Sequence, residues 1–202
     1  MSAKRPRCPR CLRPLSHCLC ALIPALQSRC HVLVIQHPSE CGHALNTAVL
    51  LVEGLVNADL LVAEQLTEHP DWLARLQDRA WRTELLFPGE TAVMLEPDAD
   101  DPRPRRLVLL DGTWRKARKL IHMNPVLQQL PRVTLPVAEP SRYRLRKSCL
   151  SGGLSSIEAG ARALQIIDPG IQAALLLRPF EALIDGQIEA MGEALFEQNH
   201  KP

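Results

Sequence analysis

The chain alternates between short apolar runs and longer stretches in which apolar residues recur every three or four positions. The apolar runs at 31–37, 58–63, 83–87 and 107–110 have the length and the Val, Leu and Ile content of buried β-strands. A shorter run at 133–135 is expected to be a last strand. Because helical patterns separate most of these runs, the sequence predicts an α/β protein with a mainly parallel sheet flanked by helices.

Local signals mark where the first helices begin and end. One helix is expected over 44–55, where Gly54 stands near the end, and another over 71–79, where Pro70 fits the first turn. A third is expected to start after Thr113 as its N-cap and to end at Asn124-Pro125.

The C-terminal third carries a second strong helix signal. Ser155 and Glu158 have the spacing of a capping box, which predicts a helix that runs to Ile167 and is broken by 168–170. An amphipathic helix is expected over 180–197. The stretch 139–153 before them is too polar and too basic to be core.

The stretch from Arg105 to Lys119 draws these patterns together. Its apolar run stops at the carboxylate of Asp111, turns at Gly112 and continues as a basic helix. Ligands of open α/β sheets collect at the carboxyl ends of the strands. The sequence therefore predicts a site for a polar substrate around Asp111.

Length and composition add a few constraints. A chain of 202 residues is long enough for one main domain with a sizeable core. It has no apolar run near the roughly 20 residues that span a bilayer, so we expect a soluble, cytoplasmic protein. A monomer is the simpler expectation for its oligomeric state. No glycine-rich phosphate loop supports a dinucleotide site.

Charge is distributed unevenly along the chain. The net charge is +2, yet residues 112–147 hold nine Lys and Arg against one acid. A charge run is often only a solvated helix face. Two basic clusters separated by an apolar stretch can instead converge on one polyanion, and a nucleic-acid backbone is the obvious candidate.

Four of the seven cysteines lie close together at the N-terminus, as Cys8, Cys11, Cys18 and Cys20. Four thiolates in so short a segment predict a structural zinc site with no open position for catalysis. Two alternatives remain: His17 can replace one thiolate, or the thiols bind no metal. We expect residues 1–28 to form a small zinc-binding knuckle and residues 29–202 to form the catalytic domain.

Several blocks of the sequence resemble the DTW-domain family. They are the cysteine segment, Gln-His-Pro-Ser-Glu at 36–40, Leu-Phe-Pro-Gly-Glu at 86–90, Leu-Asp-Gly-Thr-Trp at 110–114, Ser-Arg-Tyr-Arg-Leu-Arg-Lys at 141–147 and Leu-Ser-Ser-Ile-Glu-Ala at 154–159. The family's last block usually has Thr where this chain has Ser156, and the hydroxyl is retained.

The resemblance implies an activity and a fold. The activity is transfer of the 3-amino-3-carboxypropyl group of S-adenosylmethionine to N3 of a uridine in tRNA. The fold is similar to that of the SPOUT-type α/β proteins, in which the cofactor sits in a C-terminal trefoil knot. Nothing in the periodicity predicts a knot.

The chemistry assigns expected roles to the matching residues. Asp111 is the candidate catalytic group, either as the base for the N3 proton or as a group that orients the uracil or the cofactor. The helix that starts near Ser155 suits the cofactor's carboxylate. The full set of expected cofactor-binding residues is Pro88, Gly89, Asp111, Gly112, Thr113, Leu154, Ser155, Ser156 and Glu158.

Contacts to RNA are expected from the two basic clusters. Arg115 and Lys119 are spaced to share one helix face with His122, and phosphate contacts of this kind set register rather than sequence. The loop cluster adds Arg142, Tyr143, Arg144, Arg146 and Lys147, among which Tyr143 can stack on a splayed base.

Three residues and the reaction itself allow more than one interpretation. Trp114 suits either ring stacking or core packing, and His37 and Glu40 suit either the active site or a turn. An RNA methyltransferase would release S-adenosylhomocysteine instead of methylthioadenosine. A zinc-containing RNA-binding protein would catalyse no reaction.

Overall fold

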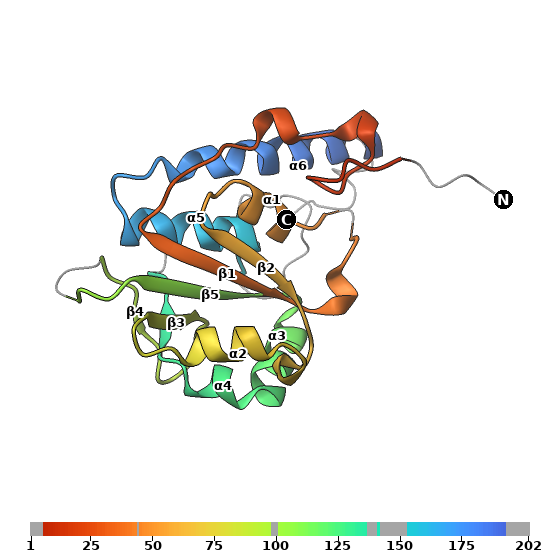
Figure 1. Ribbon diagram of the computed structural model, residues 1–202. Helices are drawn as coiled ribbons and strands as arrows, with labels where there is room; N and C mark the ends of the chain where they lie inside the picture. The colour runs from red at the N-terminus through yellow and green to blue at the C-terminus, as the bar shows by residue number, and fades with distance from the viewer. Residues whose placement is uncertain (1–5, 44, 98–100, 137–140, 142–152, 193–202) are drawn as a thin grey trace.

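Six parallel strands form a single sheet at the centre of the molecule. The computed structural model describes residues 6–43, 45–97, 101–136, 141 and 153–192 (Figure 1). The strands are β1 (Cys30–Gln36), β2 (Ala58–Val62), β3 (Arg82–Leu86), β4 (Val93–Met94), β5 (Arg105–Asp111) and β6 (Arg132–Thr134). Their order across the sheet is β2-β1-β5-β3-β6-β4, and every recorded pairing is parallel. The predicted α/β architecture is confirmed.

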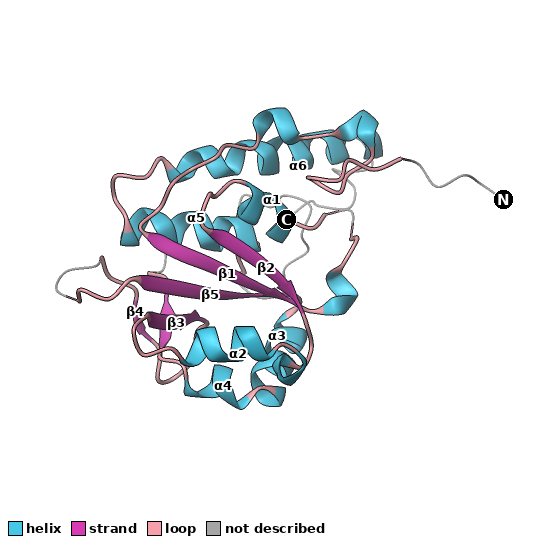
Figure 2. Cartoon of the chain, viewed as in Figure 1, coloured by secondary structure: helices cyan, strands magenta, loops and turns pink. Residues whose placement is uncertain are grey.

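Helices cover both faces of the sheet (Figure 2). One layer holds α1 (Ala48–Glu53), α5 (Ser156–Ile167) and α6 (Leu177–Met191), and the other holds α2 (Pro70–Gln77), α3 (Trp114–Met123) and α4 (Pro125–Gln129). Short 3-10 helices lie at Leu15–His17, Cys20–Leu22, Pro38–Glu40, Leu66–Glu68 and Ala173–Leu176.

Alternation along the strands explains the two layers. In β1, Val32 and Val34 join one hydrophobic cluster while Leu33 and Ile35 join the other. Successive side chains of a strand point to opposite faces, so a continuous apolar run is what a sheet covered on both sides requires.

Some boundaries differ from the sequence predictions. Helix α1 begins at Ala48 rather than 44, with Thr47 as its N-cap. The Asn46 side chain accepts hydrogen bonds from the Ala48 N–H at 3.0 Å and the Val49 N–H at 3.4 Å, two groups that have no acceptor within the helix. Strand β5 begins at Arg105, two residues before the apolar run. Arg105 can be buried there because its Nε donates to Glu84 Oε2 at 2.7 Å, so that its charge is neutralised.

The last helix also begins earlier than expected. Helix α6 starts at Leu177 instead of 180. Pro179 lies in its first turn, where backbone N–H groups have no acceptor within the helix, so the N–H that proline lacks costs no helical hydrogen bond. The helix ends at Met191, followed by Gly192 as its C-cap with a φ of +83°, and residues 193–197 of the expected 180–197 helix lie outside the described residues. None of the described helices combines the length and the apolar character needed to cross a lipid bilayer.

The connections diverge at the centre of the sheet. Strand β1 leads through α1 to β2, which lies toward one edge of the sheet. Strand β5 leads through α3 and α4 to β6, which lies toward the other edge, and these two helices cover the face of the sheet opposite to α1. Neighbouring parallel strands whose connections leave in opposite directions open a crevice at their carboxyl ends. This places the ends of β1 and β5 where a ligand site is expected.

Candidate active site at the ends of β1 and β5

The carboxylate of Asp111 is held at this crevice by two hydrogen bonds. Gln36 at the end of β1 stands directly beside Asp111 in the sheet, and its Nε2 donates to Asp111 Oδ2 at 2.7 Å. The Oγ of Ser156, in the first turn of α5, donates to Asp111 Oδ1. Gln36 is buried, whereas Asp111 is half-exposed. A strand and a helix from distant parts of the chain thus fix one carboxylate that still reaches solvent.

The backbone after Asp111 is packed closely. The His37 N–H donates to the Asp111 carbonyl at 3.0 Å. A Cβ added at Gly112 would lie 3.1 Å from Lys116 Cβ, which accounts for glycine at this turn. Thr113 Oγ1 accepts from the Lys116 N–H at 3.4 Å and caps α3, as the sequence predicted.

The start of α5 is a complete capping box. Glu158 is 2% exposed and accepts hydrogen bonds from the Ser155 N–H at 2.9 Å and the Ser155 Oγ at 2.7 Å. Ser141 Oγ also donates to Glu158, at 2.8 Å. The predicted capping box is confirmed, and its carboxylate links α5 to the beginning of the Ser141 block.

Two ion pairs form a polar rim beside the crevice. Lys116 Nζ contacts Glu40 Oε1 at 2.7 Å, and Lys119 Nζ contacts Glu64 Oε1. His37 Nε2 lies 3.3 Å from the same Glu64 oxygen. Hydrogen bonding from Lys119 holds the pKa of Glu64 below its ordinary value. Both lysines of this helix face therefore already have carboxylate partners.

His37 and Glu40 combine the two interpretations left open by the sequence. His37 Nδ1 accepts from the Ser39 N–H at 3.2 Å and caps the short helix Pro38–Glu40, which is a turn role. Both side chains also contribute to the rim next to Asp111.

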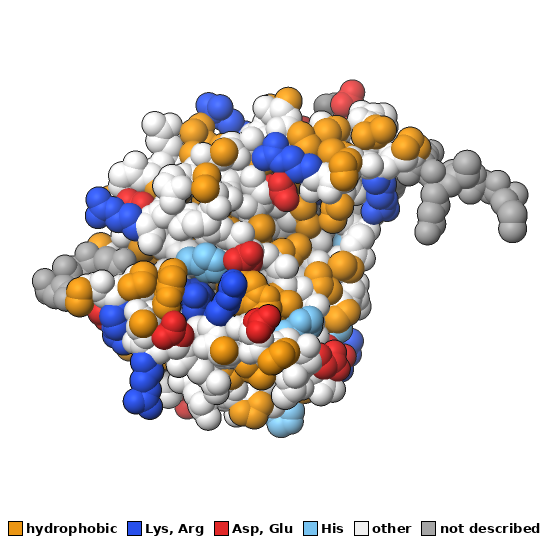
Figure 3. All heavy atoms as spheres, in the orientation of Figure 1, with side chains coloured by type: hydrophobic (Ala, Val, Ile, Leu, Met, Phe, Trp, Pro, Cys, Tyr) orange, Lys and Arg blue, Asp and Glu red, His pale blue; other side chains and the backbone are white. Residues whose placement is uncertain are grey.

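Of the expected RNA contacts, Arg115 and Lys119 are exposed on α3. The other five, Arg142, Tyr143, Arg144, Arg146 and Lys147, lie outside the described residues. On the face shown in Figure 3, the described basic and acidic side chains are interspersed.

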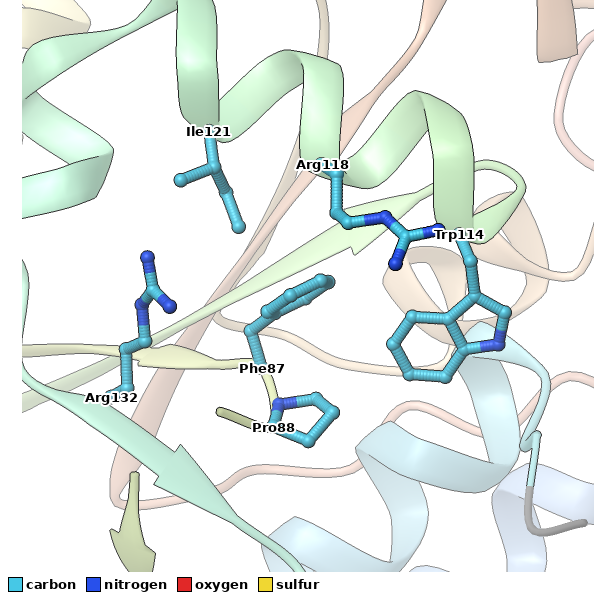
Figure 4. Close-up of a pocket in the computed structure, with 6 residues that line it drawn as sticks. All are labelled: Phe87, Pro88, Trp114, Arg118, Ile121 and Arg132. Atoms are coloured by element: carbon cyan, nitrogen blue, oxygen red, sulfur yellow. The ribbon is translucent and has the colours of Figure 1, made fainter. Parts of the chain in front are cut away.

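A hollow of about 350 Å³ lies next to the crevice, between the end of β3 and helix α3 (Figure 4). It is lined by Phe87, Pro88, Trp114, Arg118, Ile121 and Arg132. The rings of Phe87 and Trp114 meet edge to face, with centroids 5.5 Å apart. Trp114 therefore both packs against a neighbour and lines an open space.

Sequence reasoning missed Arg118 and Arg132 at this hollow. Arg118 follows Trp114 by four positions and so shares its helix face, a signal that was available. Arg132 comes from β6, which had no recognisable relation to α3 in the sequence. Gly89, expected at the cofactor, lies beside Arg132: a Cβ there would be 3.1 Å from Arg132 Nη1.

The four N-terminal cysteines come together in space. Their sulfur atoms all lie within 4.8 Å of one another, with Cys8 and Cys20 3.5 Å apart and Cys11 and Cys18 3.8 Å apart. A tetrahedral zinc site with bonds of about 2.3 Å places its sulfur atoms ~3.8 Å apart. The cluster can therefore hold a metal ion.

The surroundings of this cluster agree with a set of four thiols. His17 lies outside the group, and its Nδ1 is 2.8 Å from Ser16 Oγ. Backbone hydrogen bonds from Cys11 and Arg10 lower the pKa of the Cys8 thiol to about 6, whereas burial raises the pKa of the Cys20 thiol to about 12.

Comparison with known proteins gives one consistent family. A family model described as DTW domain matches residues 5–188. The chain is 32% identical over 205 residues to tRNA-uridine aminocarboxypropyltransferase 2 of Macaca fascicularis, covering 98% of this chain and 68% of the relative. It is 34% identical over 194 residues to the protein of the same name in Mus musculus, covering 92% of this chain and 65% of the relative.

An insect protein extends the similarity. The chain is 32% identical over 197 residues to tRNA-uridine aminocarboxypropyltransferase 2 of Drosophila melanogaster, covering 92% of this chain and 76% of the relative. The chain thus spans about two thirds of the length of the mammalian relatives. No solved structure matches it. With a DTW model covering most of its length and relatives at this level of identity, the chain belongs to the DTW-domain family.

Proposed function

We propose that this chain transfers the 3-amino-3-carboxypropyl group of S-adenosylmethionine to N3 of a uridine in tRNA. The DTW domain and the relatives named tRNA-uridine aminocarboxypropyltransferase support an enzyme of this kind. The observation that carries the proposal is the carboxylate of Asp111, held at the crevice by Gln36 and Ser156.

The donors and acceptors at this point fit both reactants. Asp111 is half-exposed, and each of its oxygens keeps a lone pair beyond the bond it already accepts. The cofactor's ammonium and the N3–H of uracil are both donors. An anchored acceptor at a crevice therefore complements either one.

The reaction is a single displacement. When bound, S-adenosylmethionine supplies a sulfonium that is bonded to Cγ of the aminocarboxypropyl group. The N3–Cγ bond forms, the Cγ–S bond breaks, methylthioadenosine leaves and N3 loses its proton. What remains for the chain is to position the partners and to assist that proton loss.

Asp111 is assigned an orienting role. Gln36 Nε2 and Ser156 Oγ both donate to the Asp111 carboxylate, one to each oxygen, and so hold it in one orientation. A fixed negative charge that holds an ammonium or an imide N–H in place agrees with these contacts better than a mobile base does.

The cofactor is assigned to the turns around this carboxylate. Its expected contacts are Pro88, Gly89, Asp111, Gly112, Thr113, Leu154, Ser155, Ser156 and Glu158. Support comes from Ser156, whose position brings the first turn of α5 against Asp111. The carboxylate of Glu158 is engaged within the capping box, so we assign it to holding α5 in place.

We assign residues 29–202 to a SPOUT-like catalytic domain. The insertion of β5 between β1 and β3 supports this assignment. The C-terminal knot depends on the path of the chain from β6 to α5, and residues 137–140 and 142–152 of that path lie outside the described residues.

We assign residues 1–28 to a zinc knuckle. Cys8, Cys11, Cys18 and Cys20 would hold the ion, and its contribution is structural, because four protein ligands complete a tetrahedral site.

Mass spectrometry tests the reaction. Purified protein, labelled S-adenosylmethionine and unmodified tRNA transcript are expected to give aminocarboxypropyluridine and methylthioadenosine. Methyluridine with S-adenosylhomocysteine would instead identify a methyltransferase, and bound tRNA without any product would identify a binding protein.

The Asp111→Ala variant tests the site. It is expected to abolish modification while tRNA affinity, measured separately, falls little. An active Asp111→Ala variant would refute the role of this carboxylate.

A further inference from the structure

We infer that the hollow lined by Phe87 and Trp114 receives the target uridine of the tRNA as an unpaired nucleotide, with Arg118 and Arg132 binding its phosphates and carbonyl edge. This inference rests on the proposed function and adds the place where the acceptor base is held.

The shape and lining of the hollow suit one nucleotide. Its volume of about 350 Å³ is at the lower end of the range for small-molecule sites. Phe87 and Trp114 provide aromatic surface, and Pro88 and Ile121 complete an apolar lining. Proteins that recognise unpaired RNA commonly stack splayed bases on such rings.

Two arginines flank this apolar surface. Arg118 comes from α3 and Arg132 from β6, and Figure 4 shows their guanidinium groups on different sides of the Phe87 ring. Within the described part of the chain, neither one has a carboxylate partner. Guanidinium groups match phosphate and carbonyl oxygens through paired N–H donors.

The contrast with the neighbouring lysines is informative. Lys116 and Lys119 also project from α3, but Glu40 and Glu64 neutralise them. The side of α3 that faces the hollow therefore carries a cation, Arg118, that is available to an anionic ligand, and Arg132 adds a second one from the facing strand.

The charge of the hollow favours the acceptor over the cofactor, although Pro88 in its lining is also an expected cofactor contact. S-adenosylmethionine carries a sulfonium and an ammonium against one carboxylate, so its net charge is positive. Two guanidiniums without acidic partners repel such a ligand and attract a nucleotide phosphate.

The hollow also opens at the edge of the sheet to which the reaction is assigned. Trp114 begins α3 and is separated from Asp111 only by Gly112 and Thr113, and Phe87 and Pro88 follow β3, the strand next to β5. Strands β3 and β5 are parallel, so their carboxyl ends share one edge of the sheet. The hollow and the anchored carboxylate therefore share one edge of the sheet.

The test separates tRNA binding from cofactor binding. The double variant R118Q/R132Q is compared with the control R79Q/R178Q. The control removes two exposed arginines, Arg79 after α2 and Arg178 on α6. Fluorescence anisotropy with labelled tRNA, without cofactor, is expected to show a Kd raised roughly 10- to 100-fold for R118Q/R132Q and unchanged for the control. Calorimetry is expected to show the same affinity for S-adenosylmethionine in R118Q/R132Q as in the control variant.

A second variant, Trp114→Phe, tests whether the Trp114 ring contacts the bound base. Uridine 5′-monophosphate is expected to quench tryptophan fluorescence in the wild-type chain and to lose this effect in Trp114→Phe, which keeps an aromatic packing partner for Phe87.

A loss of cofactor affinity with normal tRNA affinity in R118Q/R132Q would overturn the inference, as would no change in either affinity. Because these readouts need no turnover, they are independent of whether the wild-type chain forms aminocarboxypropyluridine.

Discussion

At the scale of single residues, the Gln36 side chain is the contact on which the orientation of Asp111 most depends. Gln36 is 1% exposed and has Asp111 Oδ2 2.7 Å from its Nε2. Its own position is set by β1, so it transmits the geometry of the sheet to the carboxylate. A buried amide used in this way is a positioning residue rather than one that reacts.

Replacing Gln36 with Leu is expected to lower kcat by roughly 10- to 100-fold, because Asp111 would lose one of its two donors and rotate away from the productive geometry. KM for tRNA should change little, since Gln36 is buried behind the carboxylate. Steady-state kinetics would measure both values. The conservative Gln36→Glu places two carboxylates in contact and should be less active still. Wild-type kcat in Gln36→Leu would contradict the positioning role.

A second prediction at this scale concerns pH and His31. Burial lowers the pKa of His31 below 6.5, although Asp59, whose Oδ2 is 2.9 Å from His31 Nε2, partly opposes the shift, and Arg106 and Arg75 reinforce it. The unfolded chain therefore binds this proton more readily than the folded chain. Stability should be complete above about pH 6.5 and should fall as the pH drops from there through the lowered folded value.

Urea denaturation at several pH values would measure this effect. In His31→Gln the loss of stability between about pH 7 and pH 5 should be smaller than in the wild-type chain. Equal pH dependence in the two proteins would show that His31 is not responsible.

At the scale of elements, the contact between α1 and α5 sets the position of Ser156. Gly160 allows α5 to approach α1 closely, since a Cβ there would lie 2.5 Å from Leu51 Cδ2. The same side of α5 that packs on α1 thus determines how near its first turn comes to Asp111. Helix packing and the anchored carboxylate are therefore linked.

Gly160→Ala is expected to lower the free energy of unfolding by about 1–3 kcal/mol, because overpacking exceeds the gain in helix propensity. Gly186→Ala is the matched control: Gly186 is also helical, its added Cβ meets nothing within 4 Å, and the variant should be neutral or slightly more stable. Thermal denaturation would compare the two. Equal effects at both positions would contradict the packing argument.

At the scale of the whole molecule, the cysteine cluster is joined to the main core. Cys8 and Cys11 belong to the same hydrophobic cluster as α1, α5 and α6. Arg10 Nε contacts Glu53 Oε2 at 2.9 Å, and Arg13, which is 8% exposed, donates from Nη2 to the Asn46 carbonyl at 2.9 Å. A metal ion in the cluster would therefore stabilise more than the N-terminal segment.

Removing the metal is expected to lower Tm by roughly 5–10 °C, because metal binding energy contributes directly to folding. Elemental analysis should find one zinc ion per chain, and chelator-treated protein and Cys11→Ser should show the same loss of Tm. Cys41→Ser, which changes an exposed cysteine outside the group, should melt like the wild-type chain. Unchanged melting after complete metal removal would contradict a structural role.

Much of this architecture was accessible from local patterns. The strands of the sheet core, the caps at Thr113 and Ser155 and the four clustered cysteines each depend on neighbours within a few positions, so the sequence predicted them. Helix α4 has no counterpart in the sequence predictions, because Asn124-Pro125 predicts the end of a helix, whereas Pro125 also starts a new helix after Asn124. The side chain of Asn124 accepts a bond from the Leu66 N–H at 2.7 Å, a long-range contact with no local signal.

The sequence by itself determined the fold class, the helix caps, the cysteine cluster and the position of Asp111 at the end of a strand, because periodicity, capping and ligand spacing are short-range properties. Only the tertiary structure decided that β5 lies between β1 and β3, that Gln36 and Ser156 converge on Asp111, and that Lys119 is neutralised while Arg118 and Arg132 face one hollow. Strand order and ion pairing depend on which distant surfaces pack together, and that choice is made by the whole core rather than by any one segment.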